Sequence, residues 1–184
     1  MNALADAPDD SLVQRLRDGQ LDAVGPLHQR YGRDVTSMLL RVEPSLPLEE
    51  AEELCQEVFL TFLDTVHRYE ERGQLRSWLY GIAVRKARAH RRRAWNRFSL
   101  RRRHGAQAAG VSLHQAPVDQ QVAARRALRD ALAGLPESQR EVLVLHVVEG
   151  LPGQDVARIL NISENAVWTR LHRARRALSA LESP

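Results

Sequence analysis

Apolar residues recur every three or four positions along most of the chain, and this spacing places them on one face of an α-helix. No sustained alternation of apolar and polar residues marks a strand, and no Asn-Gly or Asp-Gly pair joins two such runs. The longest helical pattern covers about residues 48–69, where Leu54, Val58 and Phe62 share one face. The sequence therefore predicts an all-α protein.

Residues 96–117 interrupt this pattern. They lack apolar periodicity and contain three consecutive arginines, two glycines, Pro117 and many Ala and Gln residues, a composition typical of a flexible linker. We therefore expect two small helical domains, residues 8–95 and 118–182. In the first, Gly25-Pro26 is expected to break the helical segment 21–31, and a last helix is expected to end near Trp95. In the second, helices are expected at about 119–134, 137–149, 152–160 and 163–181.

Charge is distributed unevenly along the chain. Residues 1–84 carry 8 basic and 15 acidic side chains, whereas residues 85–104 carry 10 basic side chains and none that is acidic. An acidic block beside a dense basic block indicates two different partners, one of them a polyanion. Almost all the basic residues are arginine, which fits either a GC-rich genome or selection for bidentate contacts to phosphates and bases.

The sequence offers little for catalysis, metal binding or membrane insertion. The single cysteine, Cys55, excludes an internal disulfide, and its helical position favours a small core residue over a redox sensor. The acidic residues gather at a helix start without histidines at ligand spacing, so no catalytic residue, metal or cofactor is expected. A secretory signal pattern is missing, and the apolar run 142–148 is too short for a bilayer, so a cytoplasmic protein is expected.

Residues 154–176 have the pattern of a helix-turn-helix. Asn161 falls in the turn, where a positive φ is expected, and Ser163 is placed to cap the second helix. Apolar residues turn inward on both helices: Val156, Ala157, Leu160, Val167, Leu171, Ala174 and Leu178. Polar residues near the start of a recognition helix suit base edges, with arginines for phosphates. A helical hairpin with a merely solvated basic face would have the same pattern.

Several separated stretches resemble the extracytoplasmic-function (ECF) sigma factors. Residues 27–41 (LHQRYGRDVTSMLLR), 51–63 (AEELCQEVFLTFL) and 75–93 (LRSWLYGIAVRKARAHRRR) resemble region 2 of that family. Residues 131–181 resemble region 4, notably in LPESQREVLVLHVVEGL and DVARILNISENAV. The resemblance implies a transcription initiation factor that binds core RNA polymerase, recognises the −35 and −10 promoter elements and promotes promoter opening. It also implies an anti-sigma factor that holds the protein until a signal releases it.

The resemblance further implies roles for particular residues. In the family, the long helix of region 2 docks on the clamp coiled coil of the polymerase β′ subunit, and the β subunit is also contacted. The counterparts here are Glu53, Leu54, Gln56, Glu57 and Leu60. Without the resemblance, these acids would be interpreted as a solvated helix face. The expected −35 contacts are Ser163, Glu164, Asn165, Trp168, Thr169, Arg170 and Arg173.

The loop 69–75 is similar to the family's loop that receives a base flipped out of the −10 element. Tyr69 fits either stacking on that base or a place in the core, and Trp78 favours the core. Arg85, Arg88 and Arg92 recur at helical spacing as a basic stripe that would neutralise phosphates. The expected −10 contacts are Tyr69, Arg76, Arg85, Lys86, Arg88 and Arg92.

Several positions depart from the family pattern, among them Arg85 and Trp168. Arg85 stands where many members have Asn, and Trp168 where Lys is common, so the promoter sequence is not predicted.

Two other classes of protein remain as alternatives. A two-domain helix-turn-helix regulator would need a ligand pocket or dimer seam within residues 1–95. A DNA-processing enzyme would need clustered carboxylates or a placed nucleophile.

Overall fold

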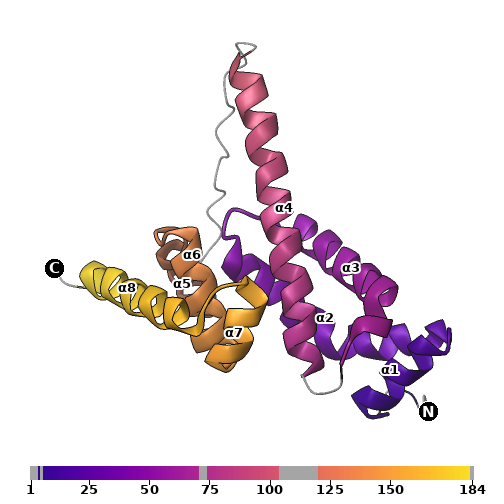
Figure 1. The fold of residues 1–184 in the computed structure, drawn as a ribbon. Helices are drawn as coiled ribbons and strands as arrows, with labels where there is room; N and C mark the ends of the chain where they lie inside the picture. The colour runs from indigo at the N-terminus through magenta and orange to yellow at the C-terminus, as the bar shows by residue number, and fades with distance from the viewer. Residues whose placement is uncertain (1–3, 5, 71–73, 104–119, 183–184) are drawn as a thin grey trace.

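The described chain consists of helices joined by short connections (Figure 1). The computed structural model describes residues 4, 6–70, 74–103 and 120–182. Within these ranges every regular element is helical and no strand occurs. The prediction of an all-α protein is confirmed.

The N-terminal unit contains α1 (Asp9–Arg17), η1 (Leu21–Ala23), α2 (Val24–Val42), α3 (Leu48–Thr65), η2 (Val66–Arg68) and α4 (Leu75–Arg103). Helices α2, α3 and α4 pack on one another and enclose a core that includes Met38, Phe62, Leu79 and Tyr80, each at most 1% exposed. Burial of such large side chains is the main force that stabilises a helical unit.

Two sequence-based expectations for this unit were wrong. Gly25-Pro26 does not break a helix, because both residues lie in the first turn of α2. A proline is tolerated there because the first N–H groups of a helix have no intrahelical acceptor. Helix α4 does not end near Trp95 but continues to Arg103. Residues 96–103 of the expected linker are therefore helical, and the remainder, 104–117, lies outside the described residues.

The C-terminal unit contains α5 (Gln120–Ala133), α6 (Glu137–Leu143), the π-helical segment η3 (Val144–Val148), α7 (Gly153–Leu160) and α8 (Glu164–Glu182). Helix α8 packs against both α6 and α7 around buried Val142, Val156, Val167 and Leu171. The η3 turn widens the end of α6, where the N–H of Glu149 donates to the carbonyl of Val144 at 2.9 Å.

The two units contact each other along α4 and the end of α2 (Figure 1). Helix α7 packs on α4, while α5 and α6 approach α2. Arg140 of α6 is 7% exposed and donates from Nε to the carbonyl of Val42 at 2.8 Å. Its Nη1 donates to the carbonyls of Leu132 at 3.2 Å and Leu135 at 3.0 Å, so one guanidinium joins the end of α2 to the end of α5 and the turn that follows it. No helix in the described ranges has the length and apolar character needed to span a bilayer.

Candidate nucleic-acid interface

Helices α7 and α8 form the predicted helix-turn-helix. Asn161 has φ 54°, the left-handed conformation that Asn tolerates best among non-glycine residues. The N–H of Ile162 then donates to the carbonyl of Ala157 at 3.0 Å. The hydroxyl of Ser163 accepts the N–H of Ala166 at 3.2 Å, which is the N-cap bond predicted for α8. Both predictions for the turn are confirmed.

The outward face of α8 carries the expected −35 residues. Glu164, Asn165, Trp168, Thr169 and Arg173 are exposed, as is the capping Ser163, and Arg170 is half-buried. The hydroxyl of Thr169 donates to the carbonyl of Asn165 at 2.9 Å. The proposed contacts therefore share the side of α8 that turns away from the core.

Trp168 does not project freely from this face, because its ring is seated against the preceding elements. The indole stands perpendicular to the His146 ring at a centroid distance of 5.0 Å. His146 Nδ1 lies 2.8 Å from the carbonyl of Leu151, so Nδ1 carries the proton that is donated. A Cβ on Gly153 would lie 2.9 Å from the indole Cζ2. His146 and Gly153 shape the site, yet no motif in the sequence indicated them.

The basic residues of α4 do not form one continuous solvent-exposed stripe. Arg85 and Arg92 are exposed, as a DNA-binding surface requires. Lys86 Nζ instead pairs with Glu57 Oε2 of α3 at 3.0 Å. Arg88 forms a bidentate pair with Glu141 of α6, at 2.8 Å from Nε and 2.6 Å from Nη2. These hydrogen bonds raise the pKa of Arg88. In this structure the guanidinium of Arg88 is therefore engaged by α6 and is not open to solvent along the stripe.

Arg76, at the start of α4, also faces the C-terminal unit. Its Nη2 donates to the carbonyl of Glu149 at 2.6 Å, and its guanidinium lies 5.8 Å from the centre of the Tyr80 ring. Tyr80 is fully buried and donates from its hydroxyl to Glu149 Oε2 at 2.7 Å. Burial and this hydrogen bond raise the pKa of Tyr80, so the phenol remains a donor at neutral pH.

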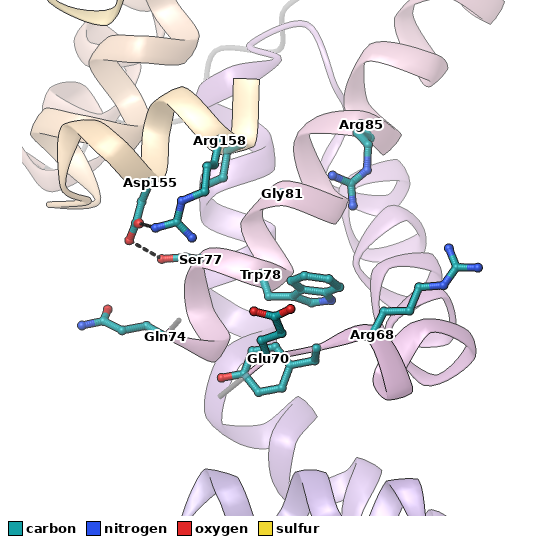
Figure 2. Close-up of a pocket in the computed structure, with 11 residues that line it drawn as sticks. Arg68, Glu70, Gln74, Ser77, Trp78, Gly81, Arg85, Asp155 and Arg158 are labelled. Carbon is teal, nitrogen blue, oxygen red and sulfur yellow. Dashed lines mark hydrogen bonds and ion pairs between the residues drawn. The ribbon is translucent and has the colours of Figure 1, made fainter. Parts of the chain in front are cut away.

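A cavity of about 300 Å³ lies between the start of α4 and helix α7. Figure 2 shows Trp78 and Arg85 on the α4 side and Asp155 and Arg158 on the α7 side. Trp78 is half-buried, and its Nε1 is buried without a hydrogen-bond partner in the described part of the chain. Sequence reasoning favoured the core for Trp78, but the ring also lines this cavity.

Tyr69 combines the two alternatives left open by the sequence. It is 4% exposed and packs edge-on against Trp78 at 5.7 Å and Phe62 at 6.4 Å, which makes it a core aromatic. It also lines the cavity. Residues 71–73 of the same loop lie outside the described residues. Tyr69 is thus placed to form a wall beside a bound group, with little of its ring available to solvent.

Helix α3 presents most of the residues expected at the polymerase interface. Glu53, Gln56 and Leu60 are exposed, and Leu60 retains 62% of its accessible surface. Glu57 is half-buried beside Lys86. Leu54 is 4% exposed because it belongs to the inward stripe of the helix. Leu54 therefore offers little surface to a partner in this structure.

Comparisons with known proteins decide the family. Residues 27–97 match the family described as Sigma-70 region 2, and residues 125–178 match Sigma-70, region 4. RNA polymerase sigma factor CarQ of Myxococcus xanthus is 33% identical over 172 residues, covering 92% of this chain and 94% of that protein. ECF RNA polymerase sigma factor ShbA of Streptomyces griseus is 30% identical over 187 residues, covering 93% of each. The chain belongs to the ECF sigma factors of the sigma-70 family.

Solved structures agree with the fold of this sigma factor. CnrH, solved in complex with the cytosolic domain of CnrY, superposes with a TM-score of 0.68 at 24% identity and covers 94% of this chain and 96% of its own. RpoE of Bartonella quintana, solved with the anti-sigma factor NepR, gives 0.64 at 21% identity, over 91% and 96% of the two chains. The N-terminal unit is region 2 and the C-terminal unit is region 4.

Family membership selects among the classes considered from the sequence. A sigma factor is a transcription initiation factor, and the basic helix α4 and the exposed α8 provide surfaces for a polyanion. The alternative of a ligand-sensing helix-turn-helix regulator lacks support, because region 2 accounts for residues 27–97.

Proposed function

We propose that this sigma factor binds core RNA polymerase, recognises the −35 and −10 elements and promotes promoter opening. One observation carries the proposal: region 4 presents the exposed helix α8, and a cavity with two aromatic residues of region 2 on one side and α7 on the other lies beside Arg85 of α4. The exposed helix is suited to binding duplex DNA, and the cavity is suited to binding an unpaired base. The two surfaces together meet the needs of recognition and opening.

For the −35 element, we propose that α8 enters the major groove by its N-terminal half. Glu164, Asn165 and Thr169 offer polar groups to base edges, and Arg170 and Arg173 follow them for phosphates. Trp168, fixed by His146, offers an apolar edge suited to a thymine methyl group. The capping Ser163 begins the helix and orients its first turn.

For the −10 element, we propose that exposed Arg85 and Arg92 bind phosphates while the cavity receives one unpaired base. Unpairing costs a few kcal/mol, and stacking on an aromatic ring contributes roughly 1–3 kcal/mol per base. Trp78 supplies that ring, and Tyr69 supports it from the core. We propose three further phosphate contacts, from Arg76, Lys86 and Arg88. Each of these side chains must first release the protein group to which it is now hydrogen-bonded.

For core polymerase, we propose the exposed face of α3 as the contact to the β′ clamp coiled coil, with region 4 contacting the β subunit. Leu60, flanked by Glu53, Gln56 and Glu57, is the apolar centre of this face. A central apolar anchor in a protein interface contributes about 1–2 kcal/mol or more. Because it would act together with core polymerase, we expect the protein to be in the cytoplasm.

Leu60 and Leu21 provide a matched pair to test the polymerase contact. Both leucines lie in the N-terminal unit and are similarly exposed, Leu60 at 62% and Leu21 at 66%, but Leu21 lies on η1 instead of α3. Leu60→Glu is expected to weaken binding to core polymerase about tenfold or more in a titration. Leu21→Glu is expected to leave the affinity unchanged. Equal effects of the two substitutions would contradict the assignment to α3.

We further propose that an anti-sigma factor holds this chain inactive. RpoE of Bartonella quintana shares the fold and was solved with the anti-sigma factor NepR. Purification of the tagged chain from its native cells, before and after stress, tests this proposal. A stoichiometric partner that is replaced by core polymerase after stress supports it, and recovery of core polymerase alone in both conditions would contradict it.

A further inference from the structure

Helix α1 contacts the segment that forms one wall of the proposed base cavity. Arg17, the last residue of α1, is half-buried and donates from Nη2 to the carbonyl of Tyr69, 52 positions away. Helix α1 also contacts η2, the turn that leads into Tyr69. The segment that matches Sigma-70 region 2 begins at residue 27, so α1 precedes it in the chain. An element outside the matched segment therefore holds this wall.

The other end of α1 is fixed to α2. Asp9 accepts hydrogen bonds from Arg30 and from the hydroxyl of Tyr31, both of which belong to α2. Arg30 also donates from Nη2 to the carbonyl of Ala7 at 2.8 Å. The apolar side chains of α1 enter the core and are at most 4% exposed: Leu12, Val13 and Leu16. Because α1 is anchored along its length, the guanidinium of Arg17 is presented from a defined position.

The carbonyl that Arg17 binds lies where the chain leaves a helical turn. The N–H of Tyr69 donates to the carbonyl of Val66 at 3.1 Å, and Tyr69 itself is extended, with φ −70° and ψ 124°. Carbonyls at a helix end have no intrahelical donor. A charged guanidinium forms a stronger hydrogen bond with such a carbonyl than a neutral donor does. The bond from Arg17 therefore sets the direction in which the chain continues to Glu70.

This direction matters because consecutive residues at this point line the cavity. Arg68, Tyr69 and Glu70 all belong to its lining, as does Trp78 (Figure 2). The Tyr69 ring packs edge-on against Trp78 at 5.7 Å. A rotation of the peptide that follows Tyr69 would move Glu70 and shift the Tyr69 ring relative to Trp78. Binding sites of this kind depend on side chains that are held in place by a second layer of contacts.

We propose that Arg17 is a positioning residue for capture of the unpaired −10 base: it holds the carbonyl of Tyr69, and with it one wall of the cavity, without contacting DNA. This inference rests on the proposed role of the cavity. The alternative is that Arg17 only stabilises the fold, as a cation in the last turn of a helix can do. A positioning residue affects binding of the captured base, whereas a purely structural residue affects all DNA contacts alike.

Binding of single-stranded −10 DNA by the holoenzyme distinguishes these two roles. The full chain is combined with core polymerase, and the probe is the non-template strand of a promoter defined by mapped start sites. Each base of the −10 element is replaced in turn by an abasic site. The replacement that weakens binding of the wild-type holoenzyme most identifies the captured base. The expected loss for one stacked base is about 5- to 150-fold in affinity.

Arg17→Ala is expected to lower the affinity for the intact strand about fivefold or more, and to change the affinity for the strand without the captured base less than about twofold. Arg17→Lys keeps the charge and a donor, so it should show a smaller loss that is also confined to the intact strand. It replaces Arg17→Ala if the alanine variant loses its helical circular dichroism. Arg15→Ala is the matched control, because Arg15 lies on the same helix and pairs with Asp22 of η1 at 2.8 Å. Both affinities should be unchanged in this control.

Hydrogen exchange in the free full chain tests the contact itself. Loss of the Arg17 guanidinium should speed exchange of the Tyr69 N–H about fivefold or more, since the turn that this N–H closes loses its support. The N–H of Leu79, within α4, should exchange at the wild-type rate. An unchanged rate at Tyr69, or equal losses of affinity for the intact and the abasic strand, overturns the inference.

Failure of the proposed function has a different result. If no abasic replacement weakens binding of the wild-type holoenzyme, the cavity captures no base, and both the −10 role of the cavity and the inference that rests on it are refuted. If the wild-type holoenzyme distinguishes the two strands and Arg17→Ala does so to the same extent, only the positioning role of Arg17 is overturned.

Discussion

Substitution of Gly153 by alanine tests whether the indole of Trp168 is seated as the structure places it. The added methyl group would lie 2.9 Å from the indole Cζ2 and 3.2 Å from Glu164 Oε1. The carboxylate ends a flexible side chain, but the ring is also held against His146. Overpacking of this kind costs about 1–3 kcal/mol. Alanine in place of glycine in a helix gains about 0.5–1 kcal/mol, so the expected net loss is up to about 2.5 kcal/mol.

Gly25 provides the matched control, because it also lies in the first turn of a helix and a Cβ there would meet nothing within 4 Å. Gly25→Ala is therefore expected to stabilise the chain by about 0.5–1 kcal/mol. At about 2–4 °C per kcal/mol for a chain of this size, the melting temperature of Gly153→Ala should lie at least about 2 °C below that of Gly25→Ala. Circular dichroism during thermal unfolding measures both.

A double-mutant cycle assigns the cost to the indole. In a Trp168→Ala background the obstructing ring is absent, so Gly153→Ala should behave like Gly25→Ala. The expected coupling energy is about 1–3 kcal/mol. The same loss of stability with and without Trp168 would show that the contact is not the cause, and would refute the placement of the ring over α7.

Three further predictions concern single sites. Because Asn161 has φ 54°, Asn161→Gly should preserve the free energy of unfolding in urea while Asn161→Val lowers it by about 1–2 kcal/mol; equal stability of the two variants would contradict this conformation. Arg173→Ala should weaken binding to a −35 duplex and reduce the slope of log affinity against log salt by about one. Arg15→Ala, the control, changes a residue that is paired with Asp22 and should alter neither quantity. If Arg173→Ala has the same slope as the wild-type chain, Arg173 does not contact a phosphate. Burial raises the pKa of the Cys55 thiol, so near pH 8 the folded chain should react with a disulfide reagent far more slowly than the urea-unfolded chain, and comparable rates would contradict its burial.

Features set by local chemistry were predictable from the sequence. Asn161 and Ser163 were assigned from the needs of a tight turn and a helix start, and both have the expected geometry. The inward positions of α8 follow from its apolar period, and Val167 and Leu171 are buried. The extent of α4 also had a local signal: Gly105 is the first helix breaker after Gly81, and the arginines before it favour helix.

Features that depend on contacts distant in sequence were not predictable. Arg88 pairs with Glu141, which is 53 positions away, and Arg76 binds the carbonyl of Glu149, which is 73 positions away. Nothing in the spacing of α4 indicates which arginines face the other unit. The same limit applies to His146, whose contact with Trp168 depends on how η3 and α8 pack.

Transcription with purified components tests whether this chain acts as a sigma factor. Genome fragments are transcribed by core polymerase with and without this chain, and the 5′ ends of the transcripts are mapped. A sigma factor is expected to produce start sites that appear only in its presence and share one pair of −35 and −10 sequences. Initiation at the same positions without the chain, or its failure to bind core polymerase, would contradict the account.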